Sequence, residues 1–194
     1  MRITIIGQKW LAAELLQQCL RDGHQVTAVY APNSADRLFQ AAAAHGVPAQ
    51  TALPAALPEC DVILAAHAHV FIPKSLRDQA RYGAVGYHPS LLPRHRGRDA
   101  VRWAVHMREP VTGGTLYRMD DGADTGGILL QDWCHIRATD TAQSLWQREL
   151  APMGLRLFGQ YLTRPDIPAV PQDETLATFE PAFTRQRLGG ERRP

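Results

Sequence analysis

RITIIGQKWLAAELLQQCL, residues 2–20, decides the class of fold. Its first five residues are mostly β-branched and lead to Gly7, and apolar residues then recur with helical spacing from Trp10 to Leu20. A β-branched run, a glycine and an apolar-periodic segment predict a strand, a turn and a helix in that order.

The same alternation recurs through the first half of the chain. Helices are predicted over the Ala-rich segment that ends at Ala44 and over 74–80. The strands predicted around them lie at 25–30 (QVTAVY), 47–50, 60–66 (CDVILAA) and 83–88 (GAVGYH). Strands separated by helices at this spacing indicate an α/β fold, in which right-handed crossovers build a mostly parallel twisted sheet flanked by helices.

The pattern changes after the proline at position 93. A helix is predicted over 99–107, followed by two strands at 112–119 and 127–136. Because only a short connection joins these two strands, they are expected to pair antiparallel at the sheet edge. A long amphipathic helix follows over 140–162, which Pro152 is expected to kink or divide.

Length and composition set the broad class of protein. The chain has 194 residues, 45% of them hydrophobic and 21% charged, which is typical of a globular domain. We predict one domain over 1–164 and a loosely attached C-terminal extension or tail, rich in proline and charge, over 165–194. The formal net charge of +2 gives no indication of nucleic-acid binding.

The N-terminal stretch and the three cysteines predict a reduced, cytoplasmic protein. MRITIIGQKW does not resemble a signal peptide, and no apolar stretch approaches the ~20 residues of a membrane helix. The cysteines are scattered without a CxxC spacing, which disfavours disulfides and zinc sites. Neither GxGxxG nor GxxxxGK[ST] occurs, so a nicotinamide or ATP enzyme is disfavoured.

Two histidines in the segment after the fourth predicted strand raise the question of a metal site. His67 and His69 alternate, as residues on one face of a strand do. Two ligands are half of a site, and no neighbouring residue completes it. A protein without a metal is the preferred interpretation.

His88 and Asp124 are the candidates for acid–base chemistry. His88 ends an apolar strand, where parallel α/β sheets place their ligand crevice, and Asp124 lies in a turn between Gly122 and Gly126. A carboxylate beside an imidazole orients the ring and raises its pKa. Spacing alone leaves a second interpretation open, in which His88 merely ends a strand and Asp124 merely makes a turn.

Two motifs support the chemical interpretation through a resemblance. HPSLLPRHRG at 88–97, followed by DDGADTGGILLQ at 120–131, resembles the folate-dependent formyltransferase family. The likeness covers roughly 1–164 and is strongest over 83–132. It implies a Rossmann-like formyltransferase fold and 10-formyltetrahydrofolate as the formyl donor, with no metal and no nucleotide.

The resemblance also assigns roles to individual residues. It implies that His88 and Asp124 are catalytic: an acceptor amine attacks the formyl carbon, protonated His88 stabilises the oxygen that becomes negative, and Asp124 keeps the imidazole charged and helps relay a proton. The implied folate-binding residues come from three segments: His69, Val70, Phe71, Ile72, Ser90, Leu91, Leu92, Asp120, Asp121, Gly122 and Ala123.

One position departs from the family pattern. The transferases carry Asn two residues before the catalytic His, and this chain has Gly86. Losing one donor to a developing oxyanion typically costs ~10²–10³ in rate. The hydrolase domain of formyltetrahydrofolate dehydrogenase also lacks this Asn, so the substitution leaves transfer and hydrolysis both open.

The expected reaction is formyl transfer to a small-molecule amine. Arg94 and Arg96 beside the crevice are expected to bind a carboxylate or phosphate of the acceptor, with a solvated basic loop as the alternative. A tRNA acceptor is disfavoured, because only about thirty residues follow the long helix, too few for a further domain.

Two alternatives to this reaction stay open. A 10-formyltetrahydrofolate hydrolase would use water in place of the amine. A non-catalytic folate-binding protein is the more distant alternative, against which the retention of His88 and Asp124 argues. The sequence does not identify the acceptor or the oligomeric state.

Overall fold

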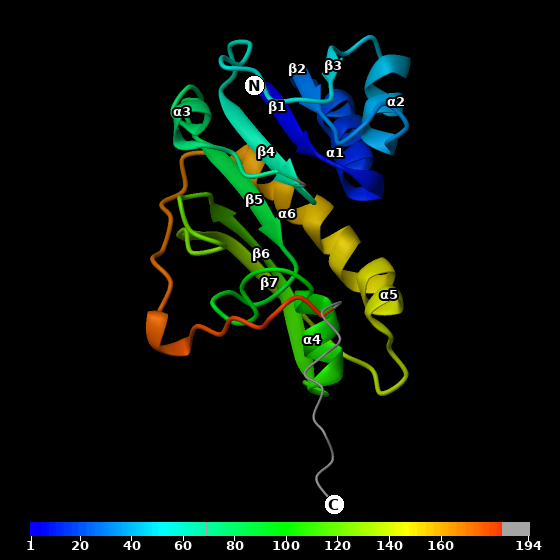
Figure 1. Cartoon of the computed structure of the whole chain (residues 1–194), viewed down its shortest axis with the longest axis vertical. Coiled ribbons are helices and arrows are strands. Elements are labelled where there is room, and N and C mark those ends of the chain that lie inside the picture. Colours follow the sequence, from blue (N-terminus) through cyan, green and yellow to red (C-terminus); the bar gives the residue numbers. More distant parts are fainter. Residues whose placement is uncertain (69, 184–194) are drawn as a thin grey trace, which may run out of the picture.

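The computed structural model of the chain describes residues 1–68 and 70–183. Seven strands form one twisted sheet in the order β3-β2-β1-β4-β5-β6-β7 (Figure 1). The first five strands are parallel, and β6 and β7 continue the sheet antiparallel. Their bounds are β1 Arg2–Gly7, β2 Gln25–Tyr30, β3 Ala49–Gln50, β4 Val62–Ala66, β5 Ala84–His88, β6 Val111–Arg118 and β7 Ile128–His135. The predicted antiparallel pairing of the last two strands at the sheet edge is therefore confirmed.

Helices cover both faces of the sheet. They are α1 Lys9–Arg21, α2 Arg37–Ala44, α3 Lys74–Arg77, α4 Ala100–His106, α5 Ala142–Leu145 and α6 Ala151–Thr163. The larger apolar core lies between the sheet and helices α1 and α6, which also pack on each other. A smaller core on the opposite face includes the region of α3 (Figure 1). Within the described ranges, no helix is long and apolar enough to cross a membrane.

The predicted long helix is real but interrupted. A π-helical turn, Trp146–Leu150, joins α5 to α6. Pro152 lies in the first turn of α6, directly after this widened turn. Proline has no N–H and its ring collides with the carbonyl four residues earlier, so the backbone cannot keep regular α-helical bonding at this point. Pro152 therefore distorts the helix without ending it.

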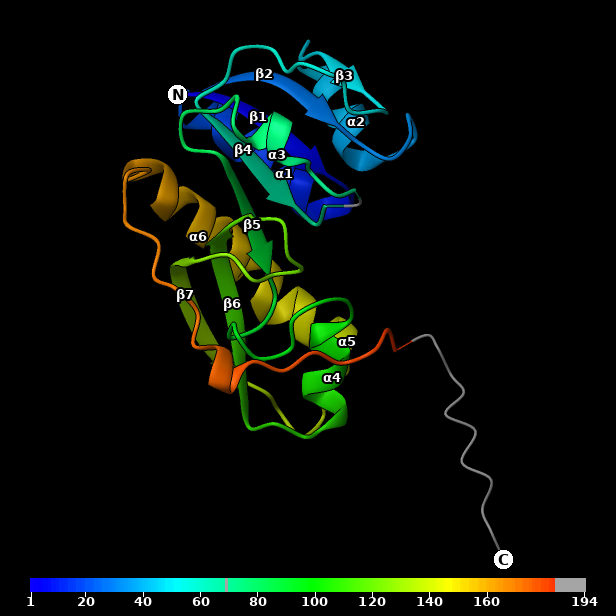
Figure 2. The same ribbon diagram turned by 60° about the vertical axis from the view of Figure 1, so that its left-hand side comes forward.

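The C-terminal segment is not a loose tail over the residues that the structure describes. Val170 exchanges two backbone hydrogen bonds of 2.8 Å with Ile128 on β7, and the N–H of Thr178 donates to the carbonyl of Pro93 at 3.1 Å. The chain after α6 thus runs along β7 and then across the loop before α4 (Figure 2). The expectation of a loosely attached tail is wrong for 165–183, because these residues hydrogen-bond to groups distant in sequence. The division of the chain at residue 164 stays a prediction.

Candidate active site

His88 is the last residue of β5, at the end of the parallel part of the sheet. Its side chain is buried, and Thr115 on β6 is its antiparallel partner. Ring atom Nε2 lies 2.7 Å from the backbone carbonyl oxygen of His95, and Nδ1 lies 3.4 Å from Oδ2 of Asp124. Both neighbours are hydrogen-bond acceptors, so a proton on either ring nitrogen points toward one of them.

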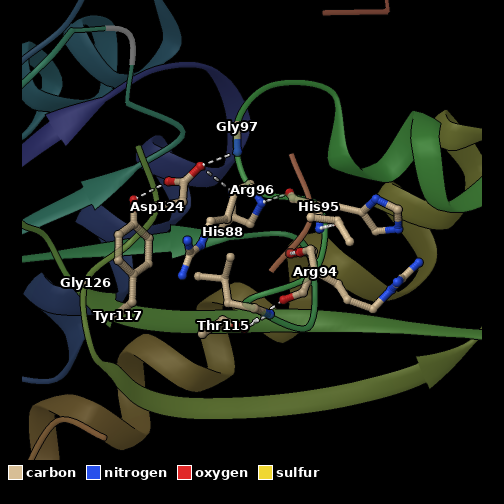
Figure 3. Close-up of polar contacts among 12 residues, drawn as sticks. His88, Arg94, His95, Arg96, Gly97, Thr115, Tyr117, Asp124 and Gly126 are labelled. Carbon is tan, nitrogen blue, oxygen red and sulfur yellow. Dashed lines mark hydrogen bonds and ion pairs between the residues drawn. The ribbon is translucent and has the colours of Figure 1, made fainter. Parts of the chain in front are cut away.

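Asp124 reaches His88 from the loop between β6 and β7. Its backbone is left-handed, with φ of +59°, a conformation that Asp adopts more readily than most residues. Oδ2 accepts a hydrogen bond of 2.8 Å from the N–H of Gly97, and Oδ1 accepts one of 2.5 Å from the hydroxyl of Tyr117. The structure therefore brings the two predicted residues together and fixes both carboxylate oxygens (Figure 3).

Tyr117 was not among the residues that sequence patterns pointed to. It lies on β6 opposite Gly86 of β5 and is buried. Burial, together with the negative charge of Asp124, raises the pKa of the Tyr117 phenol well above its ordinary value, so the hydroxyl stays protonated and acts as a donor. The only signal for it in the sequence is an aromatic residue in the strand that leads to the Asp124 loop.

Hydrogen bonds to Arg94 and to Thr115 on β6 hold the SLLP loop, residues 90–93. The hydroxyl of Ser90 donates to the carbonyl of Arg94 at 2.6 Å, and the hydroxyl of Thr115 donates to the carbonyl of Ser90 at 2.7 Å. Ser90 and Leu92 are both buried, while Leu91 is half-buried and lines a cavity of about 210 Å³. Ser90 and Leu92 thus shape the loop beside His88, and their contact with folate stays a prediction.

The other predicted folate-binding segments meet at a buried arginine. Arg77, at the end of α3, donates to the backbone carbonyl of Asp120 and pairs with the carboxylate of Asp121. Its guanidinium also lies over the ring of Phe71, 5.8 Å from the centroid. Sequence analysis missed Arg77, which joins the segment around residue 71 to the loop that carries Asp124.

Individual residues of these segments differ in what they can offer a ligand. Val70 and Phe71 are exposed, whereas Ile72 is fully buried in the smaller core. Asp120 accepts hydrogen bonds from the N–H of Gly122 and the hydroxyl of Thr125 within its own loop. Asp121, Gly122 and Ala123 are exposed. His69 lies outside the described residues.

Arg96 does not lie free beside the crevice. Its side chain is 7% exposed, and it donates to Gln172 Oε1 at 2.8 and 3.0 Å and to the Glu174 carboxylate at 2.7 and 2.8 Å. The expectation that Arg96 binds an acceptor is thus corrected: its donors are engaged by the C-terminal segment. The alternative of a solvated basic loop is wrong for Arg96, which is buried, whereas Arg94 and Arg98 are exposed. Arg94 pairs with Glu109, so its role toward an acceptor stays a prediction.

Replacing Arg96 with Ala is expected to destabilise the protein by about 1–3 kcal/mol, because the side-chain oxygen of Gln172 loses the two hydrogen bonds that it accepts from Arg96. Arg94→Ala is the matched control on the same loop; it removes an ion pair with a half-exposed arginine and should cost about 0–1 kcal/mol. Urea unfolding of both variants measures the difference. Equal stability of the two variants would contradict a structural role for Arg96.

A second cavity lies near the carboxyl ends of β1 and β4. It has a volume of about 390 Å³, and its lining includes Lys9, Asp36, His67 and Trp146. Partial desolvation in this cavity and the charge of Lys9 lower the pKa of His67, although its side chain is exposed. Among the described residues no group of three or more His, Cys, Asp or Glu side chains is placed to hold a metal ion.

Comparison with known proteins adds the family. The profile of a family described as "Formyl transferase" matches residues 34–154. Methionyl-tRNA formyltransferase of Acidobacterium capsulatum is 34% identical over 211 residues, which cover 96% of this chain and 67% of that protein. Mitochondrial 10-formyltetrahydrofolate dehydrogenase of Mus musculus is 33% identical over 201 residues, 93% of this chain and 22% of that protein. The chain thus spans about a fifth of the length of the dehydrogenases that it matches.

Solved structures share the fold. Phosphoribosylglycinamide formyltransferase from Bacillus halodurans superposes with a TM-score of 0.74 at 22% identity, covering 86% of this chain and 97% of that one. WlaRD, a sugar 3N-formyl transferase solved in the presence of dTDP and 5-N-formyl-THF, gives a TM-score of 0.77 at 19% identity, covering 93% of this chain and 69% of that one. The chain belongs to the formyl transferase family and has its Rossmann-like fold.

Proposed function

We propose that the protein transfers a formyl group from 10-formyltetrahydrofolate to the amine of a small-molecule acceptor. The observation that carries the proposal is the contact between buried His88, at the carboxyl end of β5, and half-buried Asp124, with Nδ1 and Oδ2 3.4 Å apart. The SLLP loop and the two segments joined by Arg77 lie around this edge and would supply the folate site.

The formyl transfer needs no covalent intermediate on the protein. The acceptor nitrogen forms a bond to the formyl carbon, and the carbonyl electron pair moves onto oxygen. When the tetrahedral intermediate collapses, the bond from carbon to folate N10 breaks. N10 takes up a proton and the acceptor nitrogen releases one, a transfer that an acid–base pair at the site assists.

His88 would stabilise the oxyanion through one of its N–H groups. Both ring nitrogens face acceptors in this structure, so the group that meets the oxyanion must leave its partner. The 3.4 Å contact of Nδ1 with Asp124 is longer than the 2.7 Å contact of Nε2 with His95, and it is therefore the weaker of the two. Nδ1 is accordingly the donor that we assign to the developing negative charge, while the Asp124 carboxylate stays beside the ring and stabilises its positive charge.

Hydrolysis of 10-formyltetrahydrofolate is the second candidate function. In that reaction water attacks the formyl carbon, and formate leaves with tetrahydrofolate as the other product. Gly86 favours it, because the position carries no side-chain donor two residues before His88. The 33% identity to a 10-formyltetrahydrofolate dehydrogenase over 93% of this chain points the same way.

One assay separates these functions. The protein is incubated with 10-formyltetrahydrofolate, first alone and then with amino sugar nucleotides, amino acid derivatives, glycinamide ribonucleotide or aminoacylated tRNA, while formate and tetrahydrofolate are measured. Turnover only with a small amine is the expected result. Formate release without acceptor that disappears in Asp124→Asn would establish the hydrolase instead. Tight folate binding with no turnover under any condition would leave a non-catalytic binding protein.

A further inference from the structure

A glycine and a tyrosine face each other across the strands that build the site. Gly86 of β5 and Tyr117 of β6 are antiparallel partners. A Cβ atom at position 86 would lie 3.0 Å from Cε1 of Tyr117 and 3.1 Å from its hydroxyl oxygen. The aromatic ring thus lies directly over the glycine and occupies the space that a side chain at position 86 would need.

The position of the ring places the Tyr117 hydroxyl on Asp124. The hydroxyl donates to Oδ1 at 2.5 Å, at the short end of the range for O–H···O⁻ bonds. The other oxygen, Oδ2, accepts from the N–H of Gly97 and faces His88 Nδ1. Each carboxylate oxygen therefore has its own donor, and the carboxylate cannot rotate without breaking one of these bonds (Figure 3).

The hydrogen bond from Tyr117 to Asp124 is shielded from water. Tyr117 is 6% exposed, and β5 is buried along its whole length, so the protein shields the hydroxyl from water that would compete for Oδ1. Asp124 itself comes from a loop rather than from a strand. A side chain on a loop needs hydrogen-bond partners to fix its orientation, and a hydroxyl on a strand residue is a rigidly placed partner.

We propose that Tyr117 is a positioning residue, which acts on His88 through Asp124, and that Gly86 lets the tyrosine ring lie close over β5. The proposal rests on the proposed function in that His88 and Asp124 carry the reaction. It explains the glycine at position 86 by the space that the Tyr117 ring needs, and this explanation holds whether the reaction is transfer or hydrolysis. A larger residue at position 86 displaces the ring and with it the donor to Asp124.

Tyr117→Phe removes the hydroxyl and keeps the ring over Gly86. The expected result is a loss in kcat of about 10- to 100-fold with little change in KM for 10-formyltetrahydrofolate, because the carboxylate loses its fixed direction. The pH dependence of kcat should also move, since the partner of the imidazole is altered. Gly86→Ala should reduce kcat in the same direction by shifting the ring.

Tyr87→Phe is the matched control. Tyr87 is a neighbouring buried tyrosine of β5, and its hydroxyl donates to the carbonyl of Leu150 at 2.6 Å, away from Asp124. Its loss should lower the melting temperature and leave the pH profile in place. If Tyr117→Phe behaves like Tyr87→Phe in kcat and pH profile, the positioning role is overturned.

A readout independent of activity separates this proposal from the proposed function. In protein labelled with ¹⁵N-histidine, the ring nitrogen shifts of His88, assigned with His88→Gln, report protonation and hydrogen bonding. We expect Tyr117→Phe to change the pH titration of these signals and Tyr87→Phe to leave it unchanged. A wild-type protein without turnover would refute the proposed function, while an unaltered His88 titration in Tyr117→Phe would refute the role of Tyr117.

Discussion

Replacing His88 with Gln is expected to lower kcat/KM for 10-formyltetrahydrofolate by about 10²–10⁴-fold, because the amide cannot carry the positive charge or exchange the proton that the reaction needs. Gln is chosen because its side-chain amide can still donate to the His95 carbonyl, which His88 Nε2 contacts at 2.7 Å. The measurement is steady-state turnover with the best acceptor, or formate release if the protein is a hydrolase. Folate binding, measured by calorimetry, should be largely retained.

Two further variants make this result interpretable. Asp124→Asn keeps the shape of the side chain, but an NH₂ group replaces one of the two oxygens, so only one of the hydrogen bonds from Gly97 and Tyr117 can still be accepted. A comparable loss of turnover is expected for it. His45→Gln, on an exposed histidine that follows α2, should leave turnover unchanged. Wild-type turnover in His88→Gln would remove the pair from the proposed chemistry.

Replacing Gln172 with Ala is the second change for which a large effect is expected. The Gln172 amide N–H₂ donates to the carbonyls of Asp124 and Gly126 at 2.9 and 2.7 Å, and its oxygen accepts two hydrogen bonds from Arg96. One side chain thus ties the loop that carries Asp124 to the loop that follows His88. Without it we expect about 1–3 kcal/mol less stability. A misplaced Asp124 loop should in addition lower kcat by roughly 10².

The design of this experiment distinguishes lost stability from lost positioning. Gln172→Glu keeps an acceptor for Arg96 but turns a carboxylate toward two backbone carbonyls, so it should reduce kcat at least as much as Ala. Gln160→Ala, on the exposed side of α6, is the matched control and should change neither quantity. Activity is measured well below each melting temperature. Full kcat in Gln172→Ala at such a temperature would show that the loop holds its position without the clamp.

Much of the fold was predictable because its signals are local. Strands such as 60–66 and 83–88 are continuous apolar segments. The glycines and the helical spacing of apolar residues between such strands are visible within short stretches of sequence. The structure confirms these strands with ends moved by one or two residues. Segment 47–50 shrinks to a two-residue β3, and the helix predicted over 74–80 ends at Arg77. Element ends depend on tertiary hydrogen bonds, which local patterns do not contain.

The site divides in the same way. The sequence pattern predicted His88 and Asp124 as partners at neighbouring strand ends, and the structure places them together. The reason differs: β6 runs antiparallel to β5, so the end of β6 pairs with Val85, and the loop after it has to return toward His88 to bring Asp124 into contact. Arg96 was misjudged, because a run of basic residues predicts exposure while its actual partners, Gln172 and Glu174, lie 76 and 78 residues further along the chain. No local pattern links positions so far apart.

The sequence by itself thus determined the order of strands and helices along the chain, the antiparallel pairing of the last two strands, and a histidine at the end of β5. Only the tertiary structure decided which side chains hold the site: Tyr117 over Gly86, Arg77 between two loops, and Gln172 across the Asp124 loop. The physical reason is that strand and helix formation follows local backbone preference and apolar period. Burial of a polar side chain depends instead on partners that only the folded chain brings within hydrogen-bond distance.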